Sequence, residues 1–342
     1  MNGSGTSLKR YAITRVVLVI PMVFILLTFV FLLMRVAPGN PISASLGGHV
    51  PQSVINQISH QLGYDKPILV QYKDYLWAIL HGDLGSTITD RRTVSSIIEV
   101  NGAATLELTF FAMIIAIVVG VSVGLLAGRF RDTPVDAAGR VFGIVAYAMP
   151  VFFIGLLAQL FFGSYLNWLP ISDQASPITQ ATLESHTNIM LVDAIIDRNW
   201  DAFWDVVRHL ILPAFTLGLV FAGVFIRLVR VNVIRTMKDD YIEAARARGV
   251  NERSVVYHHA FRNALVPVVT VIGLQFALLL GGAVLTETTF NWPGIGHELL
   301  LYIQNRDYAA VQGIMIVFAL VVVLISVAID FVNAFIDPRV RY

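Results

Sequence analysis

The sequence predicts an all-α membrane protein with six transmembrane helices and both termini in the cytoplasm. Three observations support this fold class. Hydrophobic residues make up 56% of the 342 residues and charged residues only 14%, whereas about 25% is the usual charged share of a soluble domain. The apolar residues form six uncharged stretches long enough to cross a hydrocarbon core of about 30 Å. The basic residues gather in alternate connecting segments.

Each predicted span has 17 to 23 residues and no charge, and about 20 residues are needed to cross the bilayer. The first span is too long for the apolar core of a signal peptide, and Arg35-Val36-Ala37-Pro38 offers no small-residue cleavage site. We therefore expect it to be retained. The predicted spans are residues 16–34, 108–128, 141–162, 210–226, 264–286 and 308–329.

The distribution of Lys and Arg predicts the orientation. With the N-terminus inside, the cytoplasmic segments hold 16 of the 24 Lys and Arg within 76 residues, and the outer segments hold 8 within 141 residues. This bias follows the positive-inside rule. The sequence therefore predicts a single integral membrane domain over residues 1–342. Its cytoplasmic segments are 1–15, 129–140, 227–262 and 330–342, and its extracytoplasmic segments are 35–107, 163–209 and 287–307.

The predicted spans contain no Asp, Glu, Lys, Arg or His in their middle. Charges at bilayer depth are costly and usually mark ion pathways, so their absence disfavours an ion-coupled carrier or a voltage sensor. Glu107, Glu287 and Asp330 stand at span ends, where we expect them to be solvated at the headgroup level.

Motifs for chemistry are absent from the sequence. There is no cysteine, which excludes thiolate metal sites and cysteine nucleophiles. No lysine follows a glycine, as a Walker A loop would require. The string Gly120-Val121-Ser122-Val123-Gly124 resembles a hydrolase motif, but it lies inside an apolar span without a histidine. We predict no catalytic residue, metal site or cofactor in this chain and no nucleic-acid partner.

Three glycines in the second span repeat every four residues. Gly120, Gly124 and Gly128 expose one face of the predicted helix. Small residues at this spacing let transmembrane helices approach closely. We therefore predict that this face packs against another helix.

The large cytoplasmic loop, residues 227–262, contains a short predicted helix. Asp240 and Glu243 have the spacing of a capping box, with Asp in the place of Ser or Thr. Gly249 can end the helix in a left-handed conformation, and Arg246 lies in the last turn, where the helix dipole favours cations. A helix of about two turns is marginal in water, so something must pack against it. A connector helix without a partner protein is the alternative.

Glu243-Ala244-Ala245, followed by Gly249, resembles the EAA loop of ATP-binding-cassette importer permeases. The commonest form of that loop continues to an I-x-L-P element, where this chain has His259-Ala260-Phe261-Arg262. Other motifs are similar to the dipeptide/oligopeptide/nickel branch, in particular its B-type permease. These motifs are Leu62-Gly63-Tyr64-Asp65-Lys66-Pro67, Gly82-Asp83-Leu84-Gly85, Arg262-Asn263-Ala264-Leu265-Val266-Pro267, Asn291-Trp292-Pro293-Gly294-Ile295-Gly296 and Asp337-Pro338-Arg339-Val340-Arg341-Tyr342.

The resemblance implies a type I importer permease fold in a prokaryotic inner or plasma membrane. It implies four further subunits: a second, homologous permease, two ATPases that bind ATP and magnesium, and an extracytoplasmic substrate-binding protein. The predicted short helix would be a coupling helix seated in a cleft of an ATPase. Glu243 and Gly249 would begin and end it, and Ala244 and Ala245 would form its docking face.

Polar and kinked positions in the spans are candidates for a transport pathway. Pro150 and Pro267 lie in or beside the third and fifth spans, and Gln275 lies inside the fifth. Packing between helices explains each of them equally well. Outside the membrane, Ile68, Tyr72, Tyr75, Leu76 and Ile79 have the spacing of an amphipathic helix within residues 64–81.

Several functions remain open at this point. The implied cargo is a di- or oligopeptide, with nickel or another small solute as the alternative. An ion-coupled secondary transporter, an intramembrane hydrolase and a structural scaffold are rival classes. The first lacks embedded ionisable groups, the second lacks a base near Ser122, and the third leaves the EAA pattern unexplained.

Overall fold

The computed structural model describes residues 4–36, 42–43, 51–61 and 63–336. Every named element within these ranges is a helix, and the one isolated β pairing there is a bridge between Ser86 and Thr93. Leu62 and the closing motif Asp337–Tyr342 lie outside the described residues. Five described helices are long and apolar enough to cross a membrane, and a sharply bent helix pair brings the number to six if it is one span. The predicted all-α membrane fold is therefore confirmed.

The predicted spans lie within helices that are mostly longer than the spans. These helices are α1 (Ser4–Val36), α5 (Val94–Arg129), α6 (Pro134–Ala148), α7 (Val151–Ala158) with the π-helix η1 (Gln159–Tyr165), α10 (Trp200–Thr236), α14 (Val266–Thr289) and α16 (Tyr308–Ile336). The shorter helices are α3 (Gln52–Gln61), α4 (Ile68–Leu80), α8 (Pro177–Thr182), α9 (Met190–Ile196), α11 (Asp240–Ala247), α12 (Glu252–Ser254), the π-helix η2 (Val255–Ala260), α13 (Phe261–Ala264) and α15 (Ile295–Gln304).

Helix α10 extends the fourth predicted span at both ends. It begins ten residues before Leu210, where the side chain of Asn199 accepts a hydrogen bond from the backbone N–H of Ala202. It then continues through Pro213 to Thr236 as one helix of 37 residues. At 1.5 Å per residue such a helix is about 55 Å long, so it reaches beyond a hydrocarbon core of about 30 Å.

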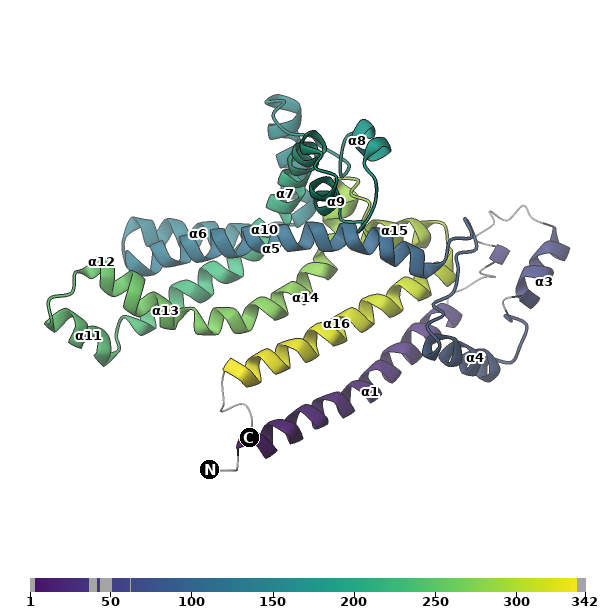
Figure 1. Cartoon of the computed structure of the whole chain (residues 1–342), viewed down its shortest axis with the longest axis horizontal. Helices are drawn as coiled ribbons and strands as arrows, with labels where there is room; N and C mark the ends of the chain where they lie inside the picture. The colour runs from purple at the N-terminus through teal and green to yellow at the C-terminus, as the bar shows by residue number, and fades with distance from the viewer. Residues whose placement is uncertain (1–3, 37–41, 44–50, 62, 337–342) are drawn as a thin grey trace. The chain divides into compact units, whose positions relative to one another are not determined.

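The third predicted span, residues 141–162, is not one continuous helix. It is broken between α6 and α7, whose directions differ by 103°. Met149 leaves the helical conformation with ψ at 137°, because the ring of a following proline disfavours the helical region for the residue before it. Pro150 then precedes α7, where its missing N–H costs no helical hydrogen bond. Figure 1 shows α7 turned away from the direction of α6.

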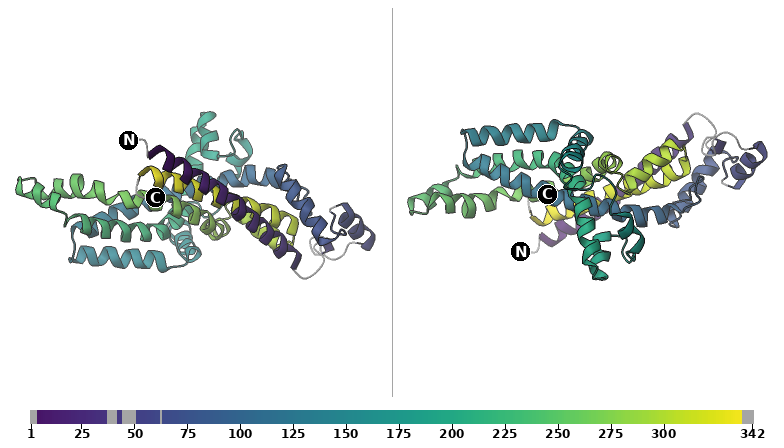
Figure 2. Two further views of the ribbon diagram at one scale, coloured as in Figure 1. Left: turned by 90° about the horizontal axis from the view of Figure 1, so that it is seen from below. Right: turned by 90° about the horizontal axis from the view of Figure 1, so that it is seen from above.

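Within the part formed by residues 104–292 and 328–336, α10 packs against α6, α14, α9 and α7. Figures 1 and 2 show α6 and α10 running side by side. Their backbones approach closely where glycines face each other, since a Cβ on Gly223 would lie 2.6 Å from the carbonyl oxygen of Gly143. The buried core of this part includes Leu108, Leu217 and Phe225.

The three glycines at four-residue spacing face α10. A Cβ on Gly124 would lie 2.7 Å from the carbonyl oxygen of Ile226, and one on Gly128 would lie 2.9 Å from the Cβ of Val233. At Gly120 the clash would be with the Cβ of Phe225. The glycines therefore permit a helix contact that larger residues would block.

In the other part of the chain, the described residues of 1–103 and 293–327, α1 lies beside α16 (Figure 1). Tyr75, Leu76 and Ile79 of α4 pack on the same cluster as Leu27 of α1. The amphipathic helix predicted within 64–81 is thus shorter than that range, and one face of it is covered. Asp307 is fully buried and accepts hydrogen bonds from the backbone N–H groups of residues 88, 89 and 310.

Candidate functional site

The short helix predicted within residues 227–262 is α11. It begins at Asp240, and the residue that flanks its N-terminus is Asp239, whose side chain makes no capping hydrogen bond. The predicted capping box of Asp240 and Glu243 is therefore wrong. Asp240 is already helical and too far along to cap the free N–H groups at the helix start. Both carboxylates still lie in the first turn, where negative charge complements the helix dipole.

The end of α11 depends on Gly249, which has a φ of +82°. Its N–H donates to the carbonyl of Arg246 at 2.9 Å, and the N–H of Val250 donates to the carbonyl of Ala245 at 3.2 Å. This pair of hydrogen bonds is a Schellman motif, which satisfies carbonyls that the last turn leaves free. Glycine adopts such a φ without steric cost.

One face of α11 is buried within its own loop. Ile242 and Ala245 are 0% and 1% exposed and pack against Val255 and Ala260 of η2. The interpretation of Ala245 as part of the docking face is therefore wrong. The loop itself supplies the surface that a helix of two turns needs, and Ala245 faces that surface.

The opposite face of α11 is open to solvent. Glu243, Ala244, Ala247 and Arg248 are exposed and lie within little more than one helical turn of one another. The small side chains at two of these positions leave room for close approach by another surface.

Arg246 and Glu252 form an ion pair across the turn that follows α11. The Nε of Arg246 donates to Oε2 of Glu252 at 3.1 Å, and its Nη2 donates to Oε1 at 2.8 Å. The hydrogen bond from Arg246 lowers the pKa of Glu252, although partial burial acts in the opposite direction. The pair therefore spans the Gly249 turn. From the sequence, only a favourable interaction of Arg246 with the helix dipole is predicted.

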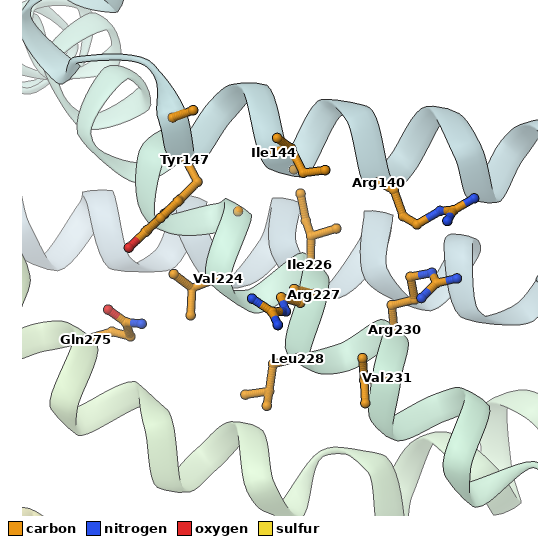
Figure 3. Close-up of a pocket in the computed structure, with 13 residues that line it drawn as sticks. Arg140, Ile144, Tyr147, Val224, Ile226, Arg227, Leu228, Arg230, Val231 and Gln275 are labelled. Atoms are coloured by element: carbon orange, nitrogen blue, oxygen red, sulfur yellow. The ribbon is translucent and has the colours of Figure 1, made fainter.

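A cavity of about 830 Å³ lies among α6, α10 and α14 (Figure 3). Of the three residues predicted for the pathway, Gln275 lines it, and Pro150 and Pro267 do not. Pro150 stands at the bend before α7, and Pro267 is an exposed residue in the first turn of α14. The polar lining residues are Arg140 and Tyr147 of α6, Arg227 and Arg230 of α10, and Gln275 of α14.

Two carboxylates at span ends are not solvated as expected. Glu107 is 2% exposed and accepts a hydrogen bond from the backbone N–H of Leu191 at 2.9 Å and another from Gln174. Glu287 is fully buried and accepts from the hydroxyl of Thr105 at 2.6 Å. Their partners are distant in sequence, so periodicity alone could not reveal them. The side chain of Asp330 lies outside the described residues.

Comparison with known proteins agrees with this architecture. Residues 120–342 match the family described as "Binding-protein-dependent transport system inner membrane component", and residues 8–96 match its N-terminal family model. The chain belongs to this family of transport permeases. It is a multi-pass protein of the bacterial inner membrane and a permease subunit of a binding-protein-dependent transport system.

Several relatives align over nearly their full length. The permease is 38% identical to the dipeptide transport system permease protein of Escherichia coli strain K12, over 97% of this chain and 99% of that protein. It is 36% identical to the protein of the same name from Alkalihalophilus pseudofirmus, with the same coverage of both chains. It is 34% identical to the glutathione transport system permease protein of Salmonella choleraesuis, over 97% and 99%. Membership of this family disfavours the stand-alone carrier, the hydrolase and the scaffold.

Proposed function

We propose that this permease carries short peptides across the inner membrane and that α11 receives the driving motion from an ATPase subunit. The proposal includes a second, homologous permease, two ATPases that bind ATP and magnesium, and an extracytoplasmic binding protein. This chain then needs no cofactor of its own. The relatives named for dipeptide and glutathione transport support a peptide cargo.

The coupling role is supported by one observation: one face of α11 is packed against its own loop and the opposite face is exposed. One side is fixed to η2 by Ile242 and Ala245, and the Arg246–Glu252 pair closes the turn that follows. A force applied to the exposed side is therefore transmitted to the rest of the loop and from there to α13 and α14, which follow η2 directly. Glu243 and Ala244 stand on that exposed side.

Orientation follows from the same proposal. An ATPase is cytoplasmic, so α11 must face the cytoplasm, and both termini then lie on that side as the charge distribution predicts. The segments 163–209 and 287–307 face the binding protein.

The coupling role is tested by replacing exposed Ala244 with Trp in the complete transporter. We expect the Ala244→Trp variant to insert normally and to lose peptide uptake, because the bulky ring prevents close contact with the ATPase. Ala138→Trp is a matched control, since Ala138 is exposed on α6 outside this loop. Normal uptake by Ala244→Trp at equal membrane abundance would contradict the coupling role.

The cargo is tested separately by uptake of labelled peptides and of nickel in cells with and without this subunit. ATP-dependent uptake of dipeptides that disappears with the gene, and returns with it, supports the proposal. Loss of nickel uptake with unchanged peptide uptake would show that the cargo is nickel and not a peptide. The role as a permease would then still stand.

A further inference from the structure

The cavity among α6, α10 and α14 carries an uncompensated positive charge. Its charged lining residues are three arginines, and no Asp or Glu lines it. Arg230 forms a two-point ion pair with the buried carboxylate of Asp136, and Arg140 lies 3.7 Å from the same carboxylate. Arg227 is exposed and has no hydrogen bond or ion pair to any described residue. One carboxylate therefore serves two arginines, and the exposed third has no partner among the described residues.

Gln275 supplies a second polar group. The residue is only 6% exposed and lines the cavity, and its amide, which bonds to no described residue, stays accessible to solvent from the cavity. Figure 3 shows the hydroxyl of Tyr147 pointing toward the end of the cavity where Gln275 lies. The cavity thus offers an amide and a phenol beside the guanidinium.

These groups match one kind of ligand. A guanidinium can bind both oxygens of a carboxylate through two parallel N–H donors, and an amide and a hydroxyl can bond a neighbouring peptide group. The remaining walls are mostly apolar, formed by residues such as Ile144, Val224 and Leu228, and so accept varied side chains. A volume of about 830 Å³ lies within the usual range of small-ligand pockets.

We propose that this cavity holds the carboxyl end of a short peptide during its passage, with the carboxylate on Arg227 and the adjacent peptide group on Gln275 and Tyr147. This inference rests on the proposed peptide cargo and assigns the residues that recognise it. The phosphate of an anionic lipid has similar chemistry, and the experiment below distinguishes the two sources.

The test uses the absence of cysteine from this chain. Val224→Cys introduces the only thiol of this chain at the cavity wall, and the rate at which a maleimide labels this subunit is followed in the complete membrane complex in vesicles. Alanyl-phenylalanine and its C-terminal amide are added directly at millimolar concentration, so that no binding protein selects between them. We expect the free acid to protect the thiol at a concentration at least about tenfold lower than the amide, since a hydrogen bond to a charged group contributes about 1.5–3 kcal/mol.

Arg227→Gln should remove this difference between acid and amide. Arg235→Gln is the matched control, because Arg235 is exposed on the same helix and does not line the cavity, and it should keep the difference. Equal protection by acid and amide in the unsubstituted complex, or an unchanged difference in Arg227→Gln, would overturn the proposal. The thiol could also be protected without any peptide, and only in vesicles that contain phosphatidylglycerol. That result would overturn the proposal and indicate a lipid site.

Peptide uptake is measured in the same vesicles after addition of the binding protein. Uptake without any Arg227-dependent protection overturns the cavity assignment alone. No ATP-dependent uptake of any peptide overturns the proposed function itself.

Discussion

Arg246 and Glu252 form a two-point ion pair, at 3.1 and 2.8 Å, that joins the last turn of α11 to the first residue of α12. The pair crosses the turn at Gly249 and lies beside the small cluster that buries Ile242 and Ala245. The segment from α11 to η2 is therefore one packed unit with one exposed helix face.

Charge reversal at this pair should weaken transport, and a second reversal should restore it. Arg246→Glu places two carboxylates together, and the double variant Arg246→Glu/Glu252→Arg returns an ion pair of opposite direction. Exposed pairs contribute only about 0.2–1 kcal/mol, so we expect uptake to fall in the single variant without loss of the protein from the membrane. Uptake that stays low in the double variant would show that transport does not depend on an ion pair between positions 246 and 252.

Gly249→Val should uncouple ATP hydrolysis from uptake. A side chain at a φ of +82° costs about 1–2 kcal/mol, and a β-branched residue costs more. Gly249→Asn is the graded control, because Asn tolerates the left-handed conformation better. The measurement is ATPase activity and uptake in the same vesicles. Equal uptake by the Val and Asn variants would rule out the conformational explanation.

Ala245→Trp should destabilise the loop rather than block a partner. Ala245 is 1% exposed, and overpacking a filled core usually costs about 1–3 kcal/mol. Limited proteolysis of the purified protein should show faster cleavage within 227–262 than in the Ala244→Trp variant. If both variants are cleaved at the same rate as the unsubstituted protein, the packing of Ala245 does not stabilise the loop.

Gly124→Ala should lower the thermal stability of the permease in detergent. The added Cβ would lie 2.7 Å from the carbonyl oxygen of Ile226, so α5 and α10 must separate. Gly281→Ala is the control in another apolar helix, because nothing lies within 4 Å of its added Cβ. A melting temperature that falls equally in both variants would indicate a general effect of glycine replacement.

The segment 163–209 should become less stable as the pH rises. The hydrogen bond between His186 Nε2 and Asp197, at 2.8 Å, raises the pKa of His186 above its usual value of 6.5. A raised pKa in the folded state gives stabilisation that is complete below about pH 6.5 and is lost as the pH rises through the folded-state pKa. Proteolysis within 163–209 should therefore be faster at pH 8 than at pH 6. His186→Gln should remove most of that difference, and an unchanged pH dependence in this variant would assign it to another group.

The number and approximate position of the apolar helices could be predicted from the sequence, because uncharged stretches of about 20 residues have few alternatives to helices in a bilayer. The packing face formed by the glycines at 120, 124 and 128 could also be predicted, because their spacing alone places them on one side of a helix. The sequence also located the short helix within residues 227–262 and its end at Gly249, because a left-handed residue after a helix favours glycine.

Contacts between distant segments could not be predicted. The burial of Glu107 depends on the N–H of Leu191, 84 residues away, and the ion pair of Asp136 depends on Arg230, 94 residues away. Contacts between residues this far apart in the chain produce no periodic pattern in the sequence. The sequence by itself determined an α-helical membrane protein with a short helix that ends at a glycine within residues 227–262, because hydropathy and helix termination act locally along the chain. Only the tertiary structure decided which face of that helix is free and which arginine of the cavity lacks a partner, because both depend on which side chains other helices bring within a few ångströms.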